Sequence, residues 1–159
     1  MPTTFLPDEE ATLALGAALA RGVTPGLSIH LHGDLGAGKT TTVRGVLRAL
    51  GYAGRVKSPT YALVEVYVVL SLNLHHFDFY RFNDPREWID AGFRESFSGP
   101  TVTLVEWPER AQGLLPPADL ELTLEISGLG RLATLTANSD AGRACLAKVG
   151  SLPGSPATP

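Results

Sequence analysis

The segment that most constrains this chain is a glycine-rich run, GDLGAGKT, at positions 33–40. It fits the pattern G-x-x-x-x-G-K-[ST], in which a tight loop between a strand and a helix cradles nucleotide phosphates. The glycines let backbone N–H groups turn inward, Lys39 brings positive charge to the β- and γ-phosphates, and Thr40 offers an oxygen to Mg²⁺. The motif therefore predicts a strand–loop–helix unit that binds a nucleoside triphosphate with magnesium.

The residues on either side have the periodicities that this motif requires. Residues 27–31 alternate as a strand does, and residues 41–50 carry apolar side chains at helical spacing before Gly51. The positive end of that helix would point at the same anion as the loop. The alternative is a chance match within a glycine-rich turn, which would not need a strand before the motif and a helix after it.

The remaining patterns predict a single α/β domain. Further helices are expected at 8–21 and at 140–149, and Asn83-Asp84-Pro85 is expected to cap a short helix with the proline in its first turn. Further strands are expected at 61–70, 72–79, 101–105, 120–126 and 131–136. The strands at 61–70 and 72–79 are expected to form a hairpin or to follow one another directly. The order favours a phosphate-loop NTPase-like three-layer sandwich with a mixed, mainly parallel central sheet. We expect one domain over residues 1–149 and a disordered tail at 150–159.

Composition narrows the setting of this domain. The 159 residues carry a net charge of −3 without a basic run, so neither DNA binding nor autonomous RNA binding is expected. The single cysteine, Cys145, excludes an internal disulfide and fits a cytoplasmic location. No apolar run approaches membrane-spanning length, and the N-terminus lacks the features of a signal peptide.

Two carboxylates are candidates for the rest of a hydrolytic site. Hydrolysis needs a carboxylate in the magnesium shell and a group that positions water. Glu106 directly follows the apolar run 101–105, and Asp78 lies within HFDFYR at 76–81. Because a charge at the end of a buried strand is costly unless paired or metal-bound, we predict a metal role for Glu106 and a nucleotide-site role for Asp78. The alternative is a pair of surface carboxylates just beyond the strand ends.

Three further residues are weaker candidates. Thr60, in the segment SPTY, could reach Mg²⁺ or water as part of a switch that senses the γ-phosphate, although a plain proline turn is the alternative. Trp107 could pack against the nucleotide site or be an ordinary core residue. Arg131 could contact phosphate or base, with a surface position as the alternative.

Missing patterns also narrow the function. The chain has neither an N-K-x-D guanine-reading motif nor a D-x-x-G switch, so a conventional GTPase is disfavoured and adenine is the expected base. It has no arginine-rich segment of the kind that forms the lid of small-molecule kinases. His30 and His32 share one strand face, but no third ligand follows at metal-site spacing, so zinc is not expected.

Four blocks occur in an order that resembles one family: GDLGAGKTT at 33–41, KSPTY at 57–61, HFDFYR at 76–81 and VEWPE at 105–109. Over residues 7–137 the chain resembles TsaE, also called YjeE, the bacterial ATPase of tRNA threonylcarbamoyladenosine synthesis. The resemblance implies a Mg²⁺-dependent ATPase that acts with TsaB and TsaD and meets tRNA indirectly. TsaD transfers the threonylcarbamoyl group to the adenosine beside the anticodon in tRNAs that read codons starting with A. The ATP cycle of the TsaE-like protein would reset the complex between turnovers.

The resemblance also assigns roles to particular residues. It implies that Thr40 and Glu106 hold Mg²⁺, and that Lys39, Thr60 and Asp78 belong to the catalytic or switch region. It places the phosphates against the loop and first helical turn: Asp34, Leu35, Gly36, Ala37, Gly38, Lys39, Thr40 and Thr41. Trp107 would lie beside the active site. Glu9 or a neighbour in the N-terminal segment, together with Arg131, would lie near the adenine. One departure is Val66, where relatives often carry an acidic residue.

Two rival functions stay open at this point. A small-molecule kinase would form ADP only with an acceptor metabolite, whereas a non-hydrolytic adaptor would use ATP only to gate assembly. If the chain is an ATPase, its turnover alone should be slow, because an arginine finger supplies roughly 10³–10⁵ in rate in related systems.

Overall fold

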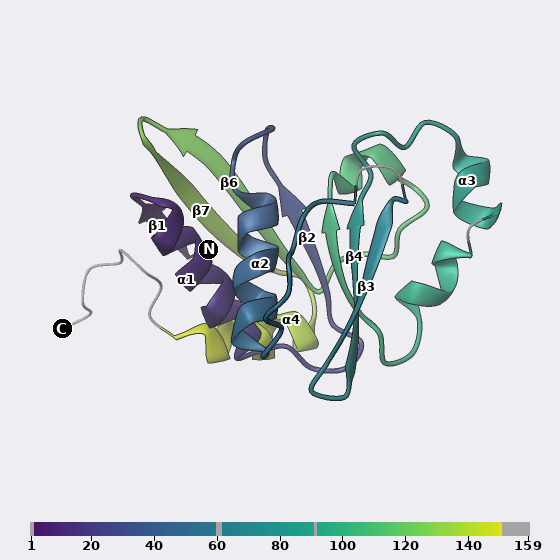
Figure 1. Ribbon diagram of the computed structural model, residues 1–159, viewed down its shortest axis with the longest axis horizontal. Helices are drawn as coiled ribbons and strands as arrows, with labels where there is room; N and C mark the ends of the chain where they lie inside the picture. The colour runs from purple at the N-terminus through teal and green to yellow at the C-terminus, as the bar shows by residue number, and fades with distance from the viewer. Residues whose placement is uncertain (1, 60–61, 91, 151–159) are drawn as a thin grey trace.

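The computed structural model describes residues 2–59, 62–90 and 92–150, which build one seven-stranded sheet with helices packed against it (Figure 1). The strands are β1 (Thr3–Leu6), β2 (Ser28–His32), β3 (Val64–Val69), β4 (Leu72–Asp78), β5 (Val102–Glu106), β6 (Leu120–Ser127) and β7 (Gly130–Ala137). The α-helices are α1 (Glu9–Ala20), α2 (Lys39–Ala49), α3 (Pro85–Asp90) and α4 (Asp140–Val149), and short 3₁₀ helices are η1 (Phe93–Phe97) and η2 (Pro108–Ala111).

The sheet is mixed, with a parallel centre. Its strand order is β1-β7-β6-β2-β5-β4-β3, and the pairs β6–β2, β2–β5 and β5–β4 are parallel. The outer pairs β1–β7, β7–β6 and β4–β3 are antiparallel, so five of the seven strands run in the same direction. The predicted α/β class with a mixed, mainly parallel sheet is confirmed. Parallel strands bring their carboxyl ends to one edge, where ligands bind in open α/β sheets.

The two faces of the sheet are covered differently. On one face α1, α2 and α4 bury a large apolar core, represented by Leu15, Val46 and Cys145. On the other face the short elements α3, η1 and η2 cover a smaller apolar cluster around Phe77 and Val105, and η2 also contacts β2. Figure 1 shows α3 near the β3–β4 end of the sheet, away from α1 and α2. The second helical layer is thus short and local.

Helix α2 is held in place by a close approach to α1. A Cβ atom built at Gly16 in α1 would lie 2.3 Å from the carbonyl oxygen of Thr42 in α2. A Cβ atom at Gly45 in α2 would lie 2.4 Å from the carbonyl oxygen of Leu13 in α1. Only glycine allows these backbones to approach so closely. Because α2 begins at the phosphate loop, this contact fixes the helix that points at the site.

The strands show how residues 64–78 are arranged, and they include one strand, β1, that was not predicted. β3 and β4 form an antiparallel hairpin, closed by Leu70 and Ser71 with φ values of 48° and 65°. β3 is one of the two edge strands of the sheet, and Val66 on it is 57% exposed. The sequence patterns did not predict β1, which pairs with β7. From residue 151 onward, the predicted tail lies outside the described residues.

Candidate nucleotide-binding site

The phosphate loop connects the end of β2 to the start of α2 and leaves the helix N-terminus without a side-chain cap. Gly38 is the N-cap residue, with φ of 107°. The first N–H groups of a helix have no partner within the helix, and together with its dipole they form an anion-binding site. At Gly33, a Cβ atom would lie 2.6 Å from the carbonyl oxygen of Leu124 in β6, so the loop can lie against the sheet only with glycine there.

Lys39 lies buried at the base of this loop. Only 4% of the residue is exposed, and its Nζ donates to the backbone carbonyls of Gly33 and Asp34, the latter at 3.0 Å. The ammonium also lies 4.3 Å from the centre of the Trp107 ring, a cation–π contact. Burial lowers the pKa of Lys39, and nearby carboxylates, Glu106 first among them, oppose that shift. A cation is thus held at the start of α2, beside the uncapped N-terminus of this helix.

Glu106 and Thr40 meet beside the lysine. The Thr40 hydroxyl donates to Oε2 of Glu106 at 2.8 Å, and Nε2 of His76 lies 2.6 Å from the same oxygen. Glu106 is the last residue of β5 and is 3% exposed, so it is part of the buried strand rather than a surface residue beyond it. A hydroxyl and a carboxylate oxygen are the ligands that Mg²⁺ takes alongside waters and phosphates.

Asp78 occupies the equivalent position on the neighbouring strand, because β4 and β5 pair Asp78 with Glu106. The Ser58 hydroxyl donates to Oδ2 of Asp78, and the Tyr80 N–H donates to Oδ1 at 2.9 Å. Both carboxylate oxygens are therefore oriented by local contacts. Thr60, two residues after Ser58, lies outside the described residues.

These groups line a cleft of about 250 Å³, which we call the phosphate cleft. The cleft is lined by loop residues, the two carboxylates and three further side chains: Leu35, Gly36, Ala37, Gly38, Lys39, Thr40, Thr41, Ser58, Asp78, Tyr80, Glu106 and Trp107. Of these, Ser58 and Tyr80 were not predicted as site residues. Asp34 contributes its backbone carbonyl to Lys39, and its side chain is exposed. The loop and the ends of β4 and β5 thus enclose one space.

Trp107 closes one side of the phosphate cleft in an unusual backbone conformation. Its φ of 56° is in the left-handed region, which bulky residues rarely adopt and which costs of order 1–3 kcal/mol. The Tyr80 ring lies 5.0 Å from the Trp107 ring, and the Arg110 guanidinium lies 5.4 Å from the Tyr80 ring. The two rings are tilted by 46° to each other, and the indole lies against Lys39, beside the site as the sequence resemblance implies.

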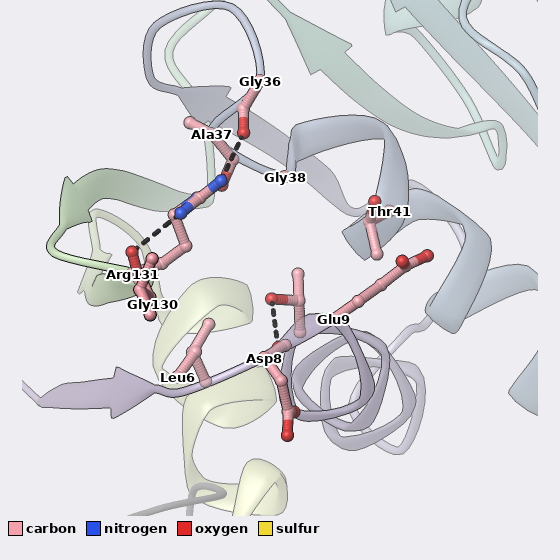
Figure 2. A pocket seen from close by; sticks show the side chains of 11 residues that line it. Leu6, Asp8, Glu9, Gly36, Ala37, Gly38, Thr41, Gly130 and Arg131 are labelled. Atoms are coloured by element: carbon pink, nitrogen blue, oxygen red, sulfur yellow. Dashed lines mark hydrogen bonds between the residues drawn. The ribbon is translucent and has the colours of Figure 1, made fainter.

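A second cleft of about 250 Å³ lies on the other side of the loop, and we call it the base cleft. It shares Gly36, Ala37, Gly38 and Thr41 with the phosphate cleft and adds residues from both ends of the domain: Leu6, Asp8, Glu9, Thr12, Leu129, Gly130 and Arg131. Figure 2 shows Arg131 of β7 reaching toward Gly36 and Ala37, and the Glu9 side chain of α1 extending on the side of Thr41. The two residues assigned to the adenine by resemblance therefore line one cleft.

Arg131 also supports the loop itself. Its guanidinium donates to the carbonyl oxygens of Gly36 at 2.9 Å and Ala37 at 3.2 Å, as well as to that of Gly130 at 2.8 Å (Figure 2). With these loop carbonyls turned toward the arginine, Arg131 is a brace of the loop as well as a wall of the base cleft. Glu9 is exposed, and its carboxylate lies 3.8 Å from Arg44.

Two features of the described residues bear on other functions. Within residues 2–59, 62–90 and 92–150, no group of three or more His, Cys, Asp or Glu side chains is arranged to hold a metal ion. A magnesium ion held by one hydroxyl, one carboxylate, waters and phosphates does not require such a group. No helix in the described part of the chain is long and apolar enough to cross a membrane.

Comparison with known proteins decides the family. The family model described as "Threonylcarbamoyl adenosine biosynthesis protein TsaE" matches residues 6–132. The chain belongs to the TsaE family. It is 39% identical over 146 residues to the tRNA threonylcarbamoyladenosine biosynthesis protein TsaE of Haemophilus influenzae, covering 89% of this chain and 92% of that one. It is 40% identical over 126 residues to the TsaE of Bacillus subtilis, covering 79% of this chain and 77% of the relative.

A solved structure supports the fold of this TsaE family member. The crystal structure of Bacillus subtilis YdiB matches with a TM-score of 0.79 and 29% identity, over 93% of both chains. The family match begins before Glu9 and ends after Arg131, so it spans both clefts. The family resemblance inferred from the four sequence blocks is confirmed.

Proposed function

We propose that this protein binds ATP with Mg²⁺ and hydrolyses it during the synthesis of threonylcarbamoyladenosine in tRNA. The observation that carries the proposal is the convergence of three groups at the end of the sheet. The buried Lys39 ammonium, the Thr40 hydroxyl and the Glu106 carboxylate lie beside the uncapped N-terminus of α2. Family membership supports the tRNA pathway, and the chemistry of the cleft supports the nucleotide.

The donor set fits a polyphosphate and a hard cation. The first N–H groups of α2 and the ammonium of Lys39 suit phosphate oxygens, while Thr40 and Glu106 offer the oxygen ligands that Mg²⁺ prefers. When bound, Mg²⁺ would neutralise the negative charge that develops on the phosphates. Glu9 and Arg131 in the base cleft would contact the adenine on the other side of the loop.

Asp78 is the residue that we assign to the attacking water. It lines the phosphate cleft, and its two carboxylate oxygens are already oriented by Ser58 and by the Tyr80 N–H. A carboxylate held in this way can accept hydrogen bonds from water and align it with the γ-phosphate. Thr60 would contribute to the same switch segment.

The partners TsaB and TsaD complete the proposal. Among the described residues that line the phosphate cleft, none is an arginine. In related phosphoryl-transfer enzymes an arginine finger raises the rate of hydrolysis by roughly 10³–10⁵, so the ATP turnover of the isolated chain should be slow. Assembly with TsaB and TsaD would supply the missing geometry, and ATP hydrolysis would then reset the complex, with tRNA contacted indirectly.

The test measures threonylcarbamoyladenosine on tRNA formed by TsaB and TsaD from threonylcarbamoyl-AMP and ATP, with and without this chain. We expect the chain to convert a single round into many, and Lys39→Ala to abolish the gain. No gain over the partners alone would refute the proposal. Equal support with a non-hydrolysable ATP analogue would identify an adaptor, and ADP formation that requires an acceptor metabolite would identify a kinase.

A further inference from the structure

His76 is a wholly buried histidine bonded to the carboxylate that we assign to the metal. It lies in β4, its exposed fraction is 0%, and its Nε2 lies 2.6 Å from Oε2 of Glu106. The same oxygen accepts the Thr40 hydroxyl at 2.8 Å. The sequence patterns predicted a nucleotide-site role for Asp78 in this strand but no role for His76, which opens the HFDFYR block and lies two residues earlier on the same face.

These two contacts fix how Glu106 can be used. A carboxylate this deeply buried needs hydrogen-bond donors, and an ionised carboxylate only accepts. His76 must therefore carry its hydrogen on Nε2. Because the imidazole and the Thr40 hydroxyl both converge on Oε2, the carboxylate cannot rotate freely, and Oε1 takes part in neither contact.

The other ring nitrogen argues against a purely structural role. Nδ1 of His76 is buried, and within the described part of the chain it has no hydrogen-bond partner. An unpartnered buried polar atom loses its hydration without compensation. In register, the strand neighbours of His76 are Leu104 and Glu65. If His76 served only to fill this space, an apolar side chain would stabilise the fold better, because it would leave no buried polar atom without a partner. The hydrogen that Nε2 donates to Glu106 is therefore the feature that explains a histidine at this position.

We propose that His76 is a positioning residue that holds the Glu106 carboxylate in the orientation needed for Mg²⁺. His76 does not itself line either cleft. It acts through Glu106, as partners behind metal-binding side chains do in other sites. This inference rests on the proposed function, because it presupposes that Glu106 serves a magnesium site.

The experiment compares two amide substitutions that differ only in reach. The side-chain nitrogen of glutamine can approach the position of imidazole Nε2, whereas that of asparagine corresponds to Nδ1. For each variant, the affinity for a fluorescent ADP analogue is measured in EDTA and in Mg²⁺, and the ratio gives the metal enhancement. We expect His76→Asn to lower this enhancement by about tenfold or more and His76→Gln to retain most of it, with equal affinities in EDTA.

His75→Asn is the matched control. It makes the same change at the adjacent histidine on the opposite face of β4, whose Nδ1 lies 2.8 Å from the Ser96 hydroxyl, and it should leave the enhancement unchanged. His76→Phe provides a second test should the asparagine variant fail to fold, because it keeps a ring in the buried space without an N–H. It should show the same loss of enhancement.

The outcomes separate this inference from the proposed function. Wild-type enhancement in His76→Asn or in His76→Phe would overturn the inference while leaving the magnesium site intact. Equal losses in His76→Gln and His76→Asn would also overturn it, because the position of the N–H would then not matter. An absence of enhancement in the wild-type protein would instead refute the proposed magnesium site, and the inference with it.

Discussion

The contact between α1 and α2 gives a sharp prediction for Gly16→Ala. Inside a helix, alanine is normally more stable than glycine by roughly 0.5–1 kcal/mol. Here the added Cβ would lie 2.3 Å from the Thr42 carbonyl oxygen and 2.8 Å from the Val46 nitrogen, both backbone atoms of α2. Reaching ordinary contact distance requires the helices to separate by about 1 Å. Overpacking of this kind costs about 1–3 kcal/mol, which reverses the sign expected from helix propensity.

The assay is urea and thermal unfolding of Gly16→Ala beside Ala14→Gly. Ala14 is an exposed position in the same helix, so its substitution measures helix propensity without a steric term. We expect Gly16→Ala to lower the melting temperature by about 2–10 °C for a chain of this size. It should also weaken nucleotide binding, because α2 carries the first turn after the phosphate loop. A Gly16→Ala protein as stable as the wild type, or more so, would refute the close approach of the two helices.

Three further predictions concern the two clefts and the buried histidine His30 in β2. Because phosphate would draw the Lys39 ammonium away from the Trp107 indole, nucleotide binding should change the intrinsic tryptophan fluorescence. Trp107→Phe should abolish this change and Trp88→Phe should keep it. A change that persists in Trp107→Phe, or that is lost in Trp88→Phe, would contradict the assignment. Arg131→Lys should weaken nucleotide binding by about tenfold in a fluorescence titration, because lysine keeps the charge but loses the forked bonds to the loop; wild-type affinity would exclude the brace. Burial, and to a smaller extent the nearby His32, lowers the pKa of His30 to about 4. As the pH falls below 6.5, His30 therefore binds a proton in the unfolded chain but stays neutral in the folded protein. This should remove about 2 kcal/mol of unfolding free energy between pH 7 and pH 5 in urea titrations, and His30→Leu, which cannot titrate, should lose less over that interval; identical losses would contradict the assignment.

The parts of the fold and site that the sequence predicted are those in which chemistry dictates residue type locally. Glycine at position 33, lysine at 39 and threonine at 40 each follow from what a phosphate loop must do, and the flanking strand and helix repeat at short range. The carboxylate of Glu106 was predictable because a charge that ends an apolar strand requires a partner. These signals all act within about ten residues.

The parts that the sequence did not predict depend on contacts between distant segments. β1 has four residues and exists through its pairing with β7, more than a hundred positions away. The contact of His76 with Glu106 depends on the register of β4 against β5, although the shared face of His76 and Asp78 was available as a signal. The left-handed backbone of Trp107 has no sequence signal, since tryptophan is unfavourable there.

The two clefts are built by different parts of the chain, and this has a consequence for how the protein can vary. In the base cleft, the wall opposite the loop comes from the two ends of the domain, residues 6–12 and 129–131. In the phosphate cleft, the wall opposite the loop comes from the middle of the chain, residues 58–107. Under the proposed function, substitutions at the ends should therefore alter KM and nucleotide preference, and substitutions in the middle should alter kcat. Preference and turnover can then diverge separately among relatives, with the shared loop as the constraint on both.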